Sequence, residues 1–426
     1  MIMMIRENLE KIKNKVKVFF IKPNKNKDDK KPTGFKLLEV LVLVAMGTMF
    51  GVFSGSFLTY NYTLDDVKEE AKEDHSKYMN EFEEAFQNVL DNYYEEVDKE
   101  KLIDSAIDGM LSTLDGYTSY MNADETKQFN ERMNGEYKGI GIEFTTAEGF
   151  VHTVVNVFEN TPAYVAGVKV GDQLVSVDDI DASTKTGTEI ASYIKGTKIK
   201  EIVLVVKRDG KDITLNITKS LIELPSVTKK TFDQTGKKVG YINVSLFADN
   251  TYMQFFQAVN SLESEGISSL VIDLRNNSGG YLHAADDMLE LFLERGDILY
   301  KMEDKDGITD YIDQTEENRT YPVVVLINEY SASASEIVAG AMKEVYGAHI
   351  VGTTSYGKGT VQQPSDLTNG GMIKVTTDKW LTPDGNWINE KGIAPTTEVK
   401  QGDTYGINPT DENDTQLQKA LELLTK

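Results

Sequence analysis

Residues 321–342 read YPVVVLINEYSASASEIVAGAM, a segment in which three structural signals follow one another. Residues 323–327 are continuously apolar, which is typical of a strand that is buried on both faces of a sheet. The alternating serines and alanines predict a turn, and the apolar residues after it recur at helical spacing. Similar strand and helix pairs at 238–264 and 268–292 predict an α/β domain whose sheet is buried on both faces.

The serine turn in this segment has two interpretations. Ser333 and Glu336 form an S-x-x-E pattern, which predicts a capping box at the start of a helix. In α/β sheets, ligands bind at the carboxyl ends of strands, which is where this turn lies. Ser333 is therefore a helix cap and also a candidate nucleophile, whereas Ser331 and Ser335 are expected to be structural.

Lys358 lies downstream in TTSYGKGTVQQ (353–363), between Gly357 and Gly359. A solvated lysine in a hairpin loop is one interpretation, and a Ser/Lys dyad with Ser333 is the other. A lysine that takes the proton of a serine must be neutral, and burial in an apolar pocket lowers its pKa toward that state. Backbone N–H groups at the start of the serine's helix would then stabilise a developing oxyanion.

Residues 331–363 resemble the active-site signature of the C-terminal processing peptidases, also called tail-specific proteases. The resemblance covers nearly everything after residue 40. It implies that Ser333 is the nucleophile, that Lys358 is the general base and that Gln362 orients the lysine. It also implies a ClpP/crotonase-like serine protease core.

A second loop, DLRNNSGGY at 273–281, carries the same resemblance. A glycine pair after a strand can turn the chain sharply and direct a backbone N–H into a cavity. By resemblance, the N–H groups of Ala334 and of the Gly279/Gly280 loop form the oxyanion hole. The expected reaction is acyl transfer to serine followed by hydrolysis, which cleaves a peptide bond without a cofactor or a metal ion.

Residues 135–222 are rich in strands and contain one helix-like stretch at 186–196. Here GIGI (139–142) and TPAYVAGVKVGDQLVSVDD (161–179) resemble a PDZ domain. Its glycines let backbone N–H groups converge on a carboxylate, and its open strand edge accepts an extended peptide. The expected peptide-binding residues are Gly139, Ile140, Gly141 and Ile142, with Ile190 and Ile194 of the following helix. We therefore expect protein or peptide substrates with exposed apolar C-termini.

Two alternatives remain open. Of the four histidines, His283 follows the glycine pair and is the candidate for a Ser/His/Asp triad, although the sequence shows no acid placed to orient it. The non-enzymatic alternative is a membrane-tethered PDZ scaffold that binds protein C-termini and carries a silent protease domain. The presence of Ser333, Lys358 and Gln362 together favours the enzyme.

Charge is distributed unevenly along the chain. Residues 1–36 carry eleven Lys/Arg and four Asp/Glu, a net charge of +7, so the other 390 residues sum to −30 within the formal total of −23. An acidic body repels phosphate backbones, so nucleic acid is not an expected partner. Cysteine is absent, which excludes disulfides, thiolate nucleophiles and Cys-ligated metals.

Residues 40–64 contain no charged residue over 25 positions, which is long enough for a helix across a bilayer. Basic residues precede this segment, so the positive-inside rule predicts a single-pass protein of the cell membrane with a cytoplasmic N-terminus and an extracytoplasmic catalytic domain. The long basic region and the lack of an A-x-A site favour an anchor over a cleaved signal peptide. Gly47, Gly51 and Gly55 form a ridge on which two such helices can pack, which together with the family resemblance is consistent with a homodimer.

The predicted architecture is multidomain, α+β and α/β, with five parts. They are a basic cytoplasmic tail (1–36), a transmembrane anchor (37–64), a helical stalk or subdomain (65–124), a β-rich PDZ domain (125–222) and a Ser/Lys protease domain with a C-terminal helix (223–426). In the stalk, apolar residues recur at helical spacing from Tyr78 to Tyr93 and from Leu102 to Leu111, and residues 114–122 form a turn-rich exit.

Overall fold

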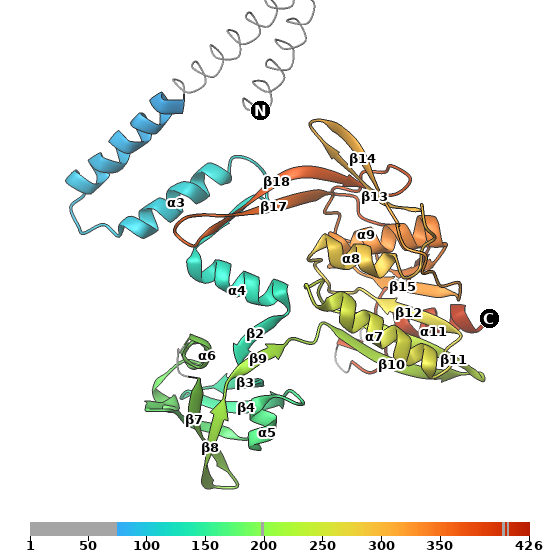
Figure 1. The fold of residues 1–426 in the computed structure, drawn as a ribbon, viewed down its shortest axis with the longest axis horizontal. Coiled ribbons are helices and arrows are strands. Elements are labelled where there is room, and N and C mark those ends of the chain that lie inside the picture. The colour runs from blue at the N-terminus through green and yellow to red at the C-terminus, as the bar shows by residue number, and fades with distance from the viewer. Residues whose placement is uncertain (1–74, 197–199, 403–404, 407–408) are drawn as a thin grey trace, which may run out of the picture. The chain divides into compact units, whose positions relative to one another are not determined.

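The computed structural model describes residues 75–196, 200–402, 405–406 and 409–426 (Figure 1). The chain divides into two units, Met1–Val97 and Asp98–Lys426. The described part of the first unit is a helix at 75–92. No helix within the described ranges combines the length and the apolar character needed to cross a membrane. The predicted anchor at 37–64 lies outside the described residues.

The second unit is built around a six-stranded sheet in the order β10-β11-β12-β15-β16-β19. Its strands are β10 (Val227–Gln234), β11 (Lys237–Val244), β12 (Ser269–Asp273), β15 (Val323–Ile327), β16 (His349–Gly352) and β19 (Thr397–Glu398). β10 runs antiparallel to β11, and the other neighbours pair in parallel. The expected α/β core is therefore confirmed.

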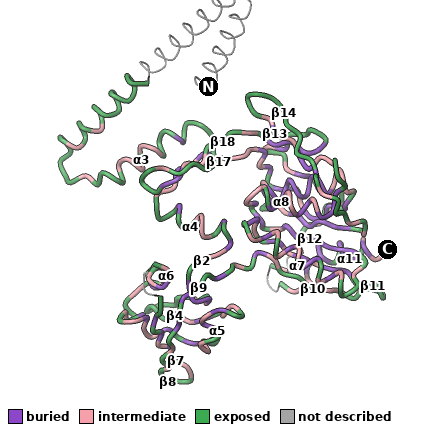
Figure 2. Tube along the Cα trace, in the orientation of Figure 1, coloured by how far each residue is buried: buried purple, intermediate pink, exposed green. Residues whose placement is uncertain are grey.

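Helices cover both faces of this sheet. α7 (Thr251–Ser264), α8 (Leu282–Leu289) and α9 (Ala334–Ala341), which continues as a π-helical turn at Met342–Tyr346, share one hydrophobic core. α11 (Thr415–Thr425) packs on the opposite face. Successive residues of β12 alternate between the two cores, and every residue of β12 and β15 is buried (Figure 2). Each fully buried Val, Leu or Ile contributes about 1.5–3 kcal/mol, so the sheet is held from both sides.

A second, antiparallel sheet has the order β1-β18-β13-β14, with β17 paired to β18. Its strands are β1 (Ser119–Met121), β13 (Ile298–Asp304), β14 (Gly307–Ile312), β17 (Thr360–Asp366) and β18 (Met372–Leu381). The sequence predicts only a turn-rich exit at 114–122, whereas β1 pairs with β18 and sets Ser119 opposite Lys374. Three residues are too few to show strand periodicity, so this long-range pairing is invisible in the sequence.

The PDZ-like module has a sheet in the order β3-β4-β5-β7-β8, with β6 paired to β5. Its elements are β3 (Ile142–Ala147), β4 (Val151–Val157), α5 (Pro162–Ala166), β5 (Gln173–Val177), β6 (Ile180–Asp181), a 3-10 turn (Ala182–Thr184), α6 (Gly187–Gly196), β7 (Glu201–Arg208) and β8 (Lys211–Thr218). Asp209 and Gly210 both have positive φ, as a two-residue hairpin between β7 and β8 requires. The paired strands β2 (Glu136–Gly139) and β9 (Ser220–Glu223) flank the module in the chain.

Two helices precede this module, α3 (Lys99–Leu111) and α4 (Ala123–Asn134). α4 begins with a capping box between Asn122 and Glu125 and ends at Gly135, whose φ of 70° suits glycine. Asn250 donates a side-chain hydrogen bond to the Gly135 carbonyl at 2.8 Å. The end of α4 is therefore fixed to the loop that leads into α7.

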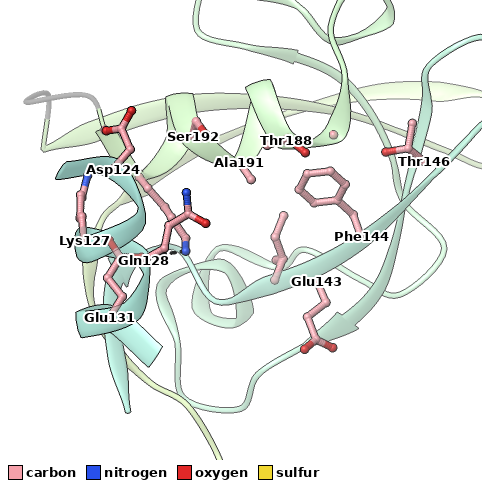
Figure 3. A pocket seen from close by; sticks show the side chains of 14 residues that line it. Asp124, Lys127, Gln128, Glu131, Glu143, Phe144, Thr146, Thr188, Ala191 and Ser192 are labelled. Atoms are coloured by element: carbon pink, nitrogen blue, oxygen red, sulfur yellow. Dashed lines mark hydrogen bonds and ion pairs between the residues drawn. The ribbon is translucent and has the colours of Figure 1, made fainter. Parts of the chain in front are cut away.

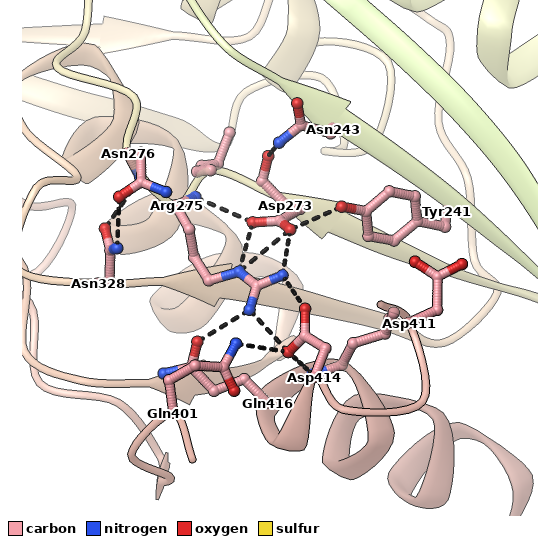
Figure 4. Close-up of polar contacts among 12 residues, drawn as sticks. Tyr241, Asn243, Asp273, Arg275, Asn276, Asn328, Gln401, Asp411, Asp414 and Gln416 are labelled. Atoms are coloured by element: carbon pink, nitrogen blue, oxygen red, sulfur yellow. Dashed lines mark hydrogen bonds and ion pairs between the residues drawn. The ribbon is translucent and has the colours of Figure 1, made fainter. Parts of the chain in front are cut away.

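A buried ionic network joins the core sheet to α11 (Figure 4). The Arg275 guanidinium donates to Asp273 at 2.6 Å, to Asp414, the N-cap of α11, at 2.7 Å, and to Gln416 at 2.9 Å. Tyr241 donates its hydroxyl to Asp273 at 2.7 Å. Burial opposes the charge on Arg275, but the two carboxylates hold its pKa above its usual range.

We expect Arg275→Met to lower the free energy of unfolding by about 3–5 kcal/mol, because it leaves Asp273 and Asp414 buried without a counter-charge. Urea unfolding followed by circular dichroism measures the change. The matched control is Arg295→Met, which breaks an exposed pair with Glu316 and should cost less than about 1 kcal/mol. Equal losses in the two variants would contradict the assigned role of Arg275.

Candidate active site

Ser333 lies at the N-terminus of α9, directly after β15. Its φ of 56° and ψ of −117° are unusual for a residue with a side chain. A capping box with Glu336 is present, as the sequence predicts. Ser331 and Ser335 are fully buried and donate their hydroxyls to the carbonyls of Leu274 and Asn277, each at 2.9 Å. Among the three serines, Ser333 is the one whose side chain reaches a cavity.

The glycine loop lies against the serine turn. A Cβ on Gly279 would come within 2.9 Å of the Ser333 Cβ and 3.1 Å of the Ala334 nitrogen, and a Cβ on Gly280 would meet the Phe247 carbonyl at 2.1 Å. Both glycines have positive φ. The two positions therefore require glycine for space and for backbone conformation.

The three backbone N–H groups expected in an oxyanion hole differ in whether they already have an acceptor in the structure. Gly279 N–H donates to the Asn277 side chain at 2.9 Å, so it has no donor left for an oxyanion, contrary to the expectation for this residue. Gly280 N–H and Ala334 N–H have no acceptor among the described residues. The available donors are therefore those of Ala334 and Gly280, and Gly279 supplies room.

Lys358 is held between Gly357 and Gly359 at the start of β17. Burial lowers the pKa of its ammonium, and the like charge of Lys374 lowers it further, while Glu336 and Asp115 act in the opposite direction. Its Nζ lies 5.0 Å from the centre of the Tyr117 ring. In the described contacts no hydrogen bond joins Lys358 Nζ to Ser333 Oγ. The expected dyad partners therefore line one cavity, with no hydrogen bond between them in the described contacts.

One carboxylate joins the serine turn to the lysine loop. Glu336 is fully buried and accepts hydrogen bonds from the backbone N–H groups of Ser333 (2.8 Å), Gly357 (2.7 Å) and Lys358 (2.9 Å), and from the hydroxyl of Ser355 (2.6 Å). A buried carboxylate is stable only with such donors. Its position fixes the two loops relative to each other.

Gln362 donates its amide N–H groups to Thr360 Oγ1 and to Thr376 Oγ1, each at 3.1 Å, and in the described contacts its carbonyl accepts no hydrogen bond from Lys358. Thr376 N–H in turn donates to Thr118 Oγ1 at 3.2 Å, and Thr118 Oγ1 donates to Asp115 at 2.9 Å. The segment that supplies Thr118 also supplies Tyr117 above Lys358. No functional role for this segment can be predicted from the sequence, because nothing local marks its approach to residues more than 240 positions away.

Ser333, Lys358, Gln362, Gly279 and Gly280 line a single cavity of about 460 Å³. Phe129, Arg132 and Met133 of α4 and Lys374 of β18 form another part of its wall. The cavity therefore combines a serine at a helix terminus, free N–H donors and a lysine with a lowered pKa. These groups are those needed for nucleophilic attack on a carbonyl.

His283 is the histidine that the sequence offers for a Ser/His/Asp triad. His283 lines the same cavity, and its Nε2 lies 3.1 Å from Asp249 Oδ1, so the acid that the sequence did not reveal is present. Both side chains are exposed, and no hydrogen bond joins His283 to Ser333 in the described contacts. His152 is buried within the PDZ-like module. Within the described ranges, no group of three or more His, Asp or Glu side chains is placed to hold a metal ion.

A second cavity, of about 820 Å³, lies between β3, α6 and α4 (Figure 3). Ile142, Phe144, Ala191 and Lys195 line it. Ile140, Ile190 and Ile194 are buried in the core of the module instead, contrary to the expected apolar pocket. On an amphipathic helix only some apolar positions face a groove, and the sequence could not decide which.

Two of the residues predicted to bind the peptide carboxylate, Gly139 and Gly141, have defined backbone roles in the structure. Gly139 pairs with Ser220 in the β2–β9 ladder, and Gly141 has a φ of 87°. A feature that the sequence did not predict is the wall formed by Asp124, Lys127, Gln128 and Glu131 of α4. Lys195 of α6 donates to Glu131 at 2.9 Å across this groove.

The chain matches three family models in succession. They are described as the activating protease CtpB N-terminal domain (residues 42–126), a PDZ domain (139–218) and peptidase family S41 (238–399). The match to S41 includes the serine turn, the glycine loop and the lysine loop. The PDZ match includes the groove between β3 and α6.

Curated relatives are similar over most of their length. The chain is 35% identical over 383 residues to the carboxy-terminal processing protease CtpB of Bacillus subtilis (strain 168), covering 87% of this chain and 80% of that protein. The carboxy-terminal processing protease CtpA of the same organism is 32% identical over 382 residues, with 86% and 81% covered. A solved structure of a photosystem II D1 C-terminal processing protease aligns at 27% identity with a TM-score of 0.44, over 75% of this chain and 92% of that one.

We expect Lys374→Gln to move the rising limb of the pH–rate profile to higher pH. A general base must be neutral, so activity rises as pH passes through the pKa of Lys358, and removing the like charge of Lys374 raises that pKa. The measurement is kcat/KM against pH for an uncharged peptide. Lys379→Gln, on the same strand but outside the cavity, is the control and should leave the profile in place; an unmoved profile for Lys374→Gln would refute the coupling.

Proposed function

The chain belongs to peptidase family S41, as a carboxy-terminal processing serine protease with a PDZ domain, and from this we propose that Ser333 and Lys358 form its catalytic dyad. PDZ-mediated binding of protein C-termini supplies its substrates. The observation that carries the assignment is the carboxylate of Glu336, which binds the backbone of both Ser333 and Lys358.

In the proposed reaction, Ser333 Oγ attacks the peptide carbonyl while neutral Lys358 accepts the hydroxyl proton. The N–H groups of Gly280 and Ala334 stabilise the oxyanion, and Lys358 then passes the proton to the leaving amine. Water, activated by the same lysine, hydrolyses the acyl-enzyme. Lys358 Nζ lies 5.0 Å from the centre of the Tyr117 ring, and the first step requires it to come within hydrogen-bond distance of Ser333 Oγ.

Gln362 is proposed to hold the lysine in that position. Its two amide protons are directed at Thr360 and Thr376, so its carbonyl oxygen remains available to accept a hydrogen bond from Lys358. The threonines fix which way the amide faces. A residue that fixes the general base reduces the entropy lost on reaching the transition state.

For the PDZ domain, we propose that a C-terminal tail adds to β3 as an extra strand and places an apolar last side chain beside Ile142, Phe144 and Ala191. The carboxylate would bind in the loop formed by Gly139, Ile140, Gly141 and Ile142. The positive φ of Gly141 supports this, because such a conformation turns neighbouring N–H groups toward one anion.

The proposed location is the cell membrane, with residues 37–64 as a single-pass anchor and the catalytic domain outside the cytoplasm. The uncharged segment and the basic residues before it support this orientation.

The chain is also proposed to form a homodimer, supported by exposed Tyr78, Met79 and Phe82 on the helix at 75–92. Proteolysis of intact cells should remove residues 75–426 but not 1–36, and chemical crosslinking should give a dimer; the reverse protection would reject the orientation.

We expect Ser333→Ala and Lys358→Ala each to lower kcat at least about a thousandfold, because either change removes a member of one catalytic unit. The measurement is mass spectrometry of the products from an unstructured substrate with an apolar tail. His283→Ala should keep most of the activity, which separates the dyad from a Ser/His/Asp triad. Thermal unfolding of the variants confirms that each remains folded.

A panel of such substrates that differ only in their C-terminal residue tests the proposed preference for an apolar tail. Substrates that end in an apolar residue should be cleaved faster than those ending in Asp, and amidation of the C-terminus should slow cleavage. Full activity of Ser333→Ala or Lys358→Ala would contradict the dyad. Equal rates for all tails would contradict the proposed tail preference while leaving the dyad intact.

A further inference from the structure

The active-site cavity differs in charge from the chain that surrounds it. The chain carries a formal charge of −23, yet among the described residues that line the cavity none is Asp or Glu. Three lining residues are basic: Arg132, Lys358 and Lys374. Lys358 is the proposed general base and Lys374 lowers its pKa, but the proposed reaction gives neither Arg132 nor Lys374 a contact with the substrate.

Lys374 extends from β18 into this cavity. Its Nζ lies 5.1 Å from the centre of the Phe129 ring of α4. No carboxylate, carbonyl or hydroxyl accepts a hydrogen bond from this ammonium among the described contacts. The side chain is half-buried, and burial lowers the pKa of the amine. An ammonium placed on an aromatic face without an oxygen partner has all three of its donors available to a ligand.

Arg132 approaches the same cavity from α4, three residues after Phe129. It is exposed, and none of the described residues forms an ion pair or a side-chain hydrogen bond with it. A guanidinium binds a planar carboxylate with two donors, so it suits an anionic ligand well. The two unpaired cations therefore come from different elements and converge on one cavity.

Among the described residues, no nearby carboxylate forms an ion pair with Lys374 or Arg132. Glu336 is buried and occupied by four donors. Asp249 is paired with His283, and His283 is the member of this pair that lines the cavity. Asp115 is bound to Thr118 and to the backbone of its own turn. The described lining thus contains basic side chains and no carboxylate inside an acidic protein, and low-dielectric walls concentrate the field of such groups.

We propose that Lys374 and Arg132 form a subsite for a carboxylate of the substrate close to the scissile bond, which makes this enzyme prefer acidic residues beside the cleavage point. The proposal rests on the proposed role of Ser333 as the nucleophile. It adds a preference for the charge of the substrate residues beside the bond that is cut. It is separate from the PDZ groove, which binds the tail in another cavity. Two sources supply this chemistry: an Asp or Glu side chain, or the terminal carboxylate of a tail that ends within the cavity.

The test uses peptides that share one PDZ-binding tail and differ only in having Glu or Gln at a single position, scanned over the residues flanking the cleavage site. In the unaltered enzyme, Glu should give a kcat/KM about tenfold or more above Gln at one position, as expected for a charge-assisted hydrogen bond. Lys374→Gln and Arg132→Gln should each bring this ratio close to one. The ratio is measured within each enzyme, so the change in Lys358 caused by losing Lys374 cancels.

Two further arms identify the source of the carboxylate and supply the control. Peptides that end one to three residues after the cleavage site are compared as free acids and as amides; a difference that disappears in Lys374→Gln assigns the subsite to the terminal carboxylate. Lys379→Gln should keep the Glu preference. A ratio near one at every position together with no acid–amide difference, or a preference that both cavity variants retain, would overturn the subsite. Cleavage that survives Ser333→Ala would instead reject the proposed catalytic centre.

Discussion

The carboxylate of Glu336 is the contact on which the site depends. It is buried and forms no ion pair with the residues that the structure describes, and it accepts hydrogen bonds from three backbone N–H groups and one hydroxyl. Removing such donors from a buried charge costs several kcal/mol, so the serine turn and the lysine loop cannot drift apart independently. Because the same carboxylate accepts a hydrogen bond from the N–H of Ser333, it also helps to maintain the unusual backbone conformation of this residue, the proposed nucleophile. One interaction therefore fixes two loops that are separated by a complete strand.

The remaining parts of the site are brought in by long-range pairing. β1 adds to the antiparallel sheet through β18, and this pairing sets Tyr117 over Lys358 and Thr118 beside Thr376. α4 follows at once and presents opposite faces to two cavities, with Phe129 and Arg132 in one and Lys127 and Glu131 in the other. The PDZ domain is thus placed in the chain between two segments that both line the proposed active-site cavity.

The sequence revealed the parts of this arrangement that are local. A continuous apolar strand, a serine at a helix start and a lysine between glycines each have a short-range signature, and the structure has them at the expected positions. The failures are non-local. Gly279 was expected to donate to an oxyanion, but its N–H is taken by Asn277, a bond that no spacing rule indicates. Ile190 and Ile194 face the core and not the groove, since the helical period gives an apolar face but not its neighbour. Asp249 beside His283, and the strand at 119–121, depend on contacts that appear only after folding.

The pairing of β1 with β18 also has a consequence for the order in which the protein assembles. Thr118 and Thr376, which join the two strands, are 258 residues apart, and the whole PDZ domain is synthesised between them. A contact of that separation forms late, because a long loop must close before the pairing can stabilise it. Tyr117 leaves the ribosome early, and Lys358 arrives only when most of the chain has been made. The proposed Ser333/Lys358 centre is therefore complete only after most of the chain has been synthesised.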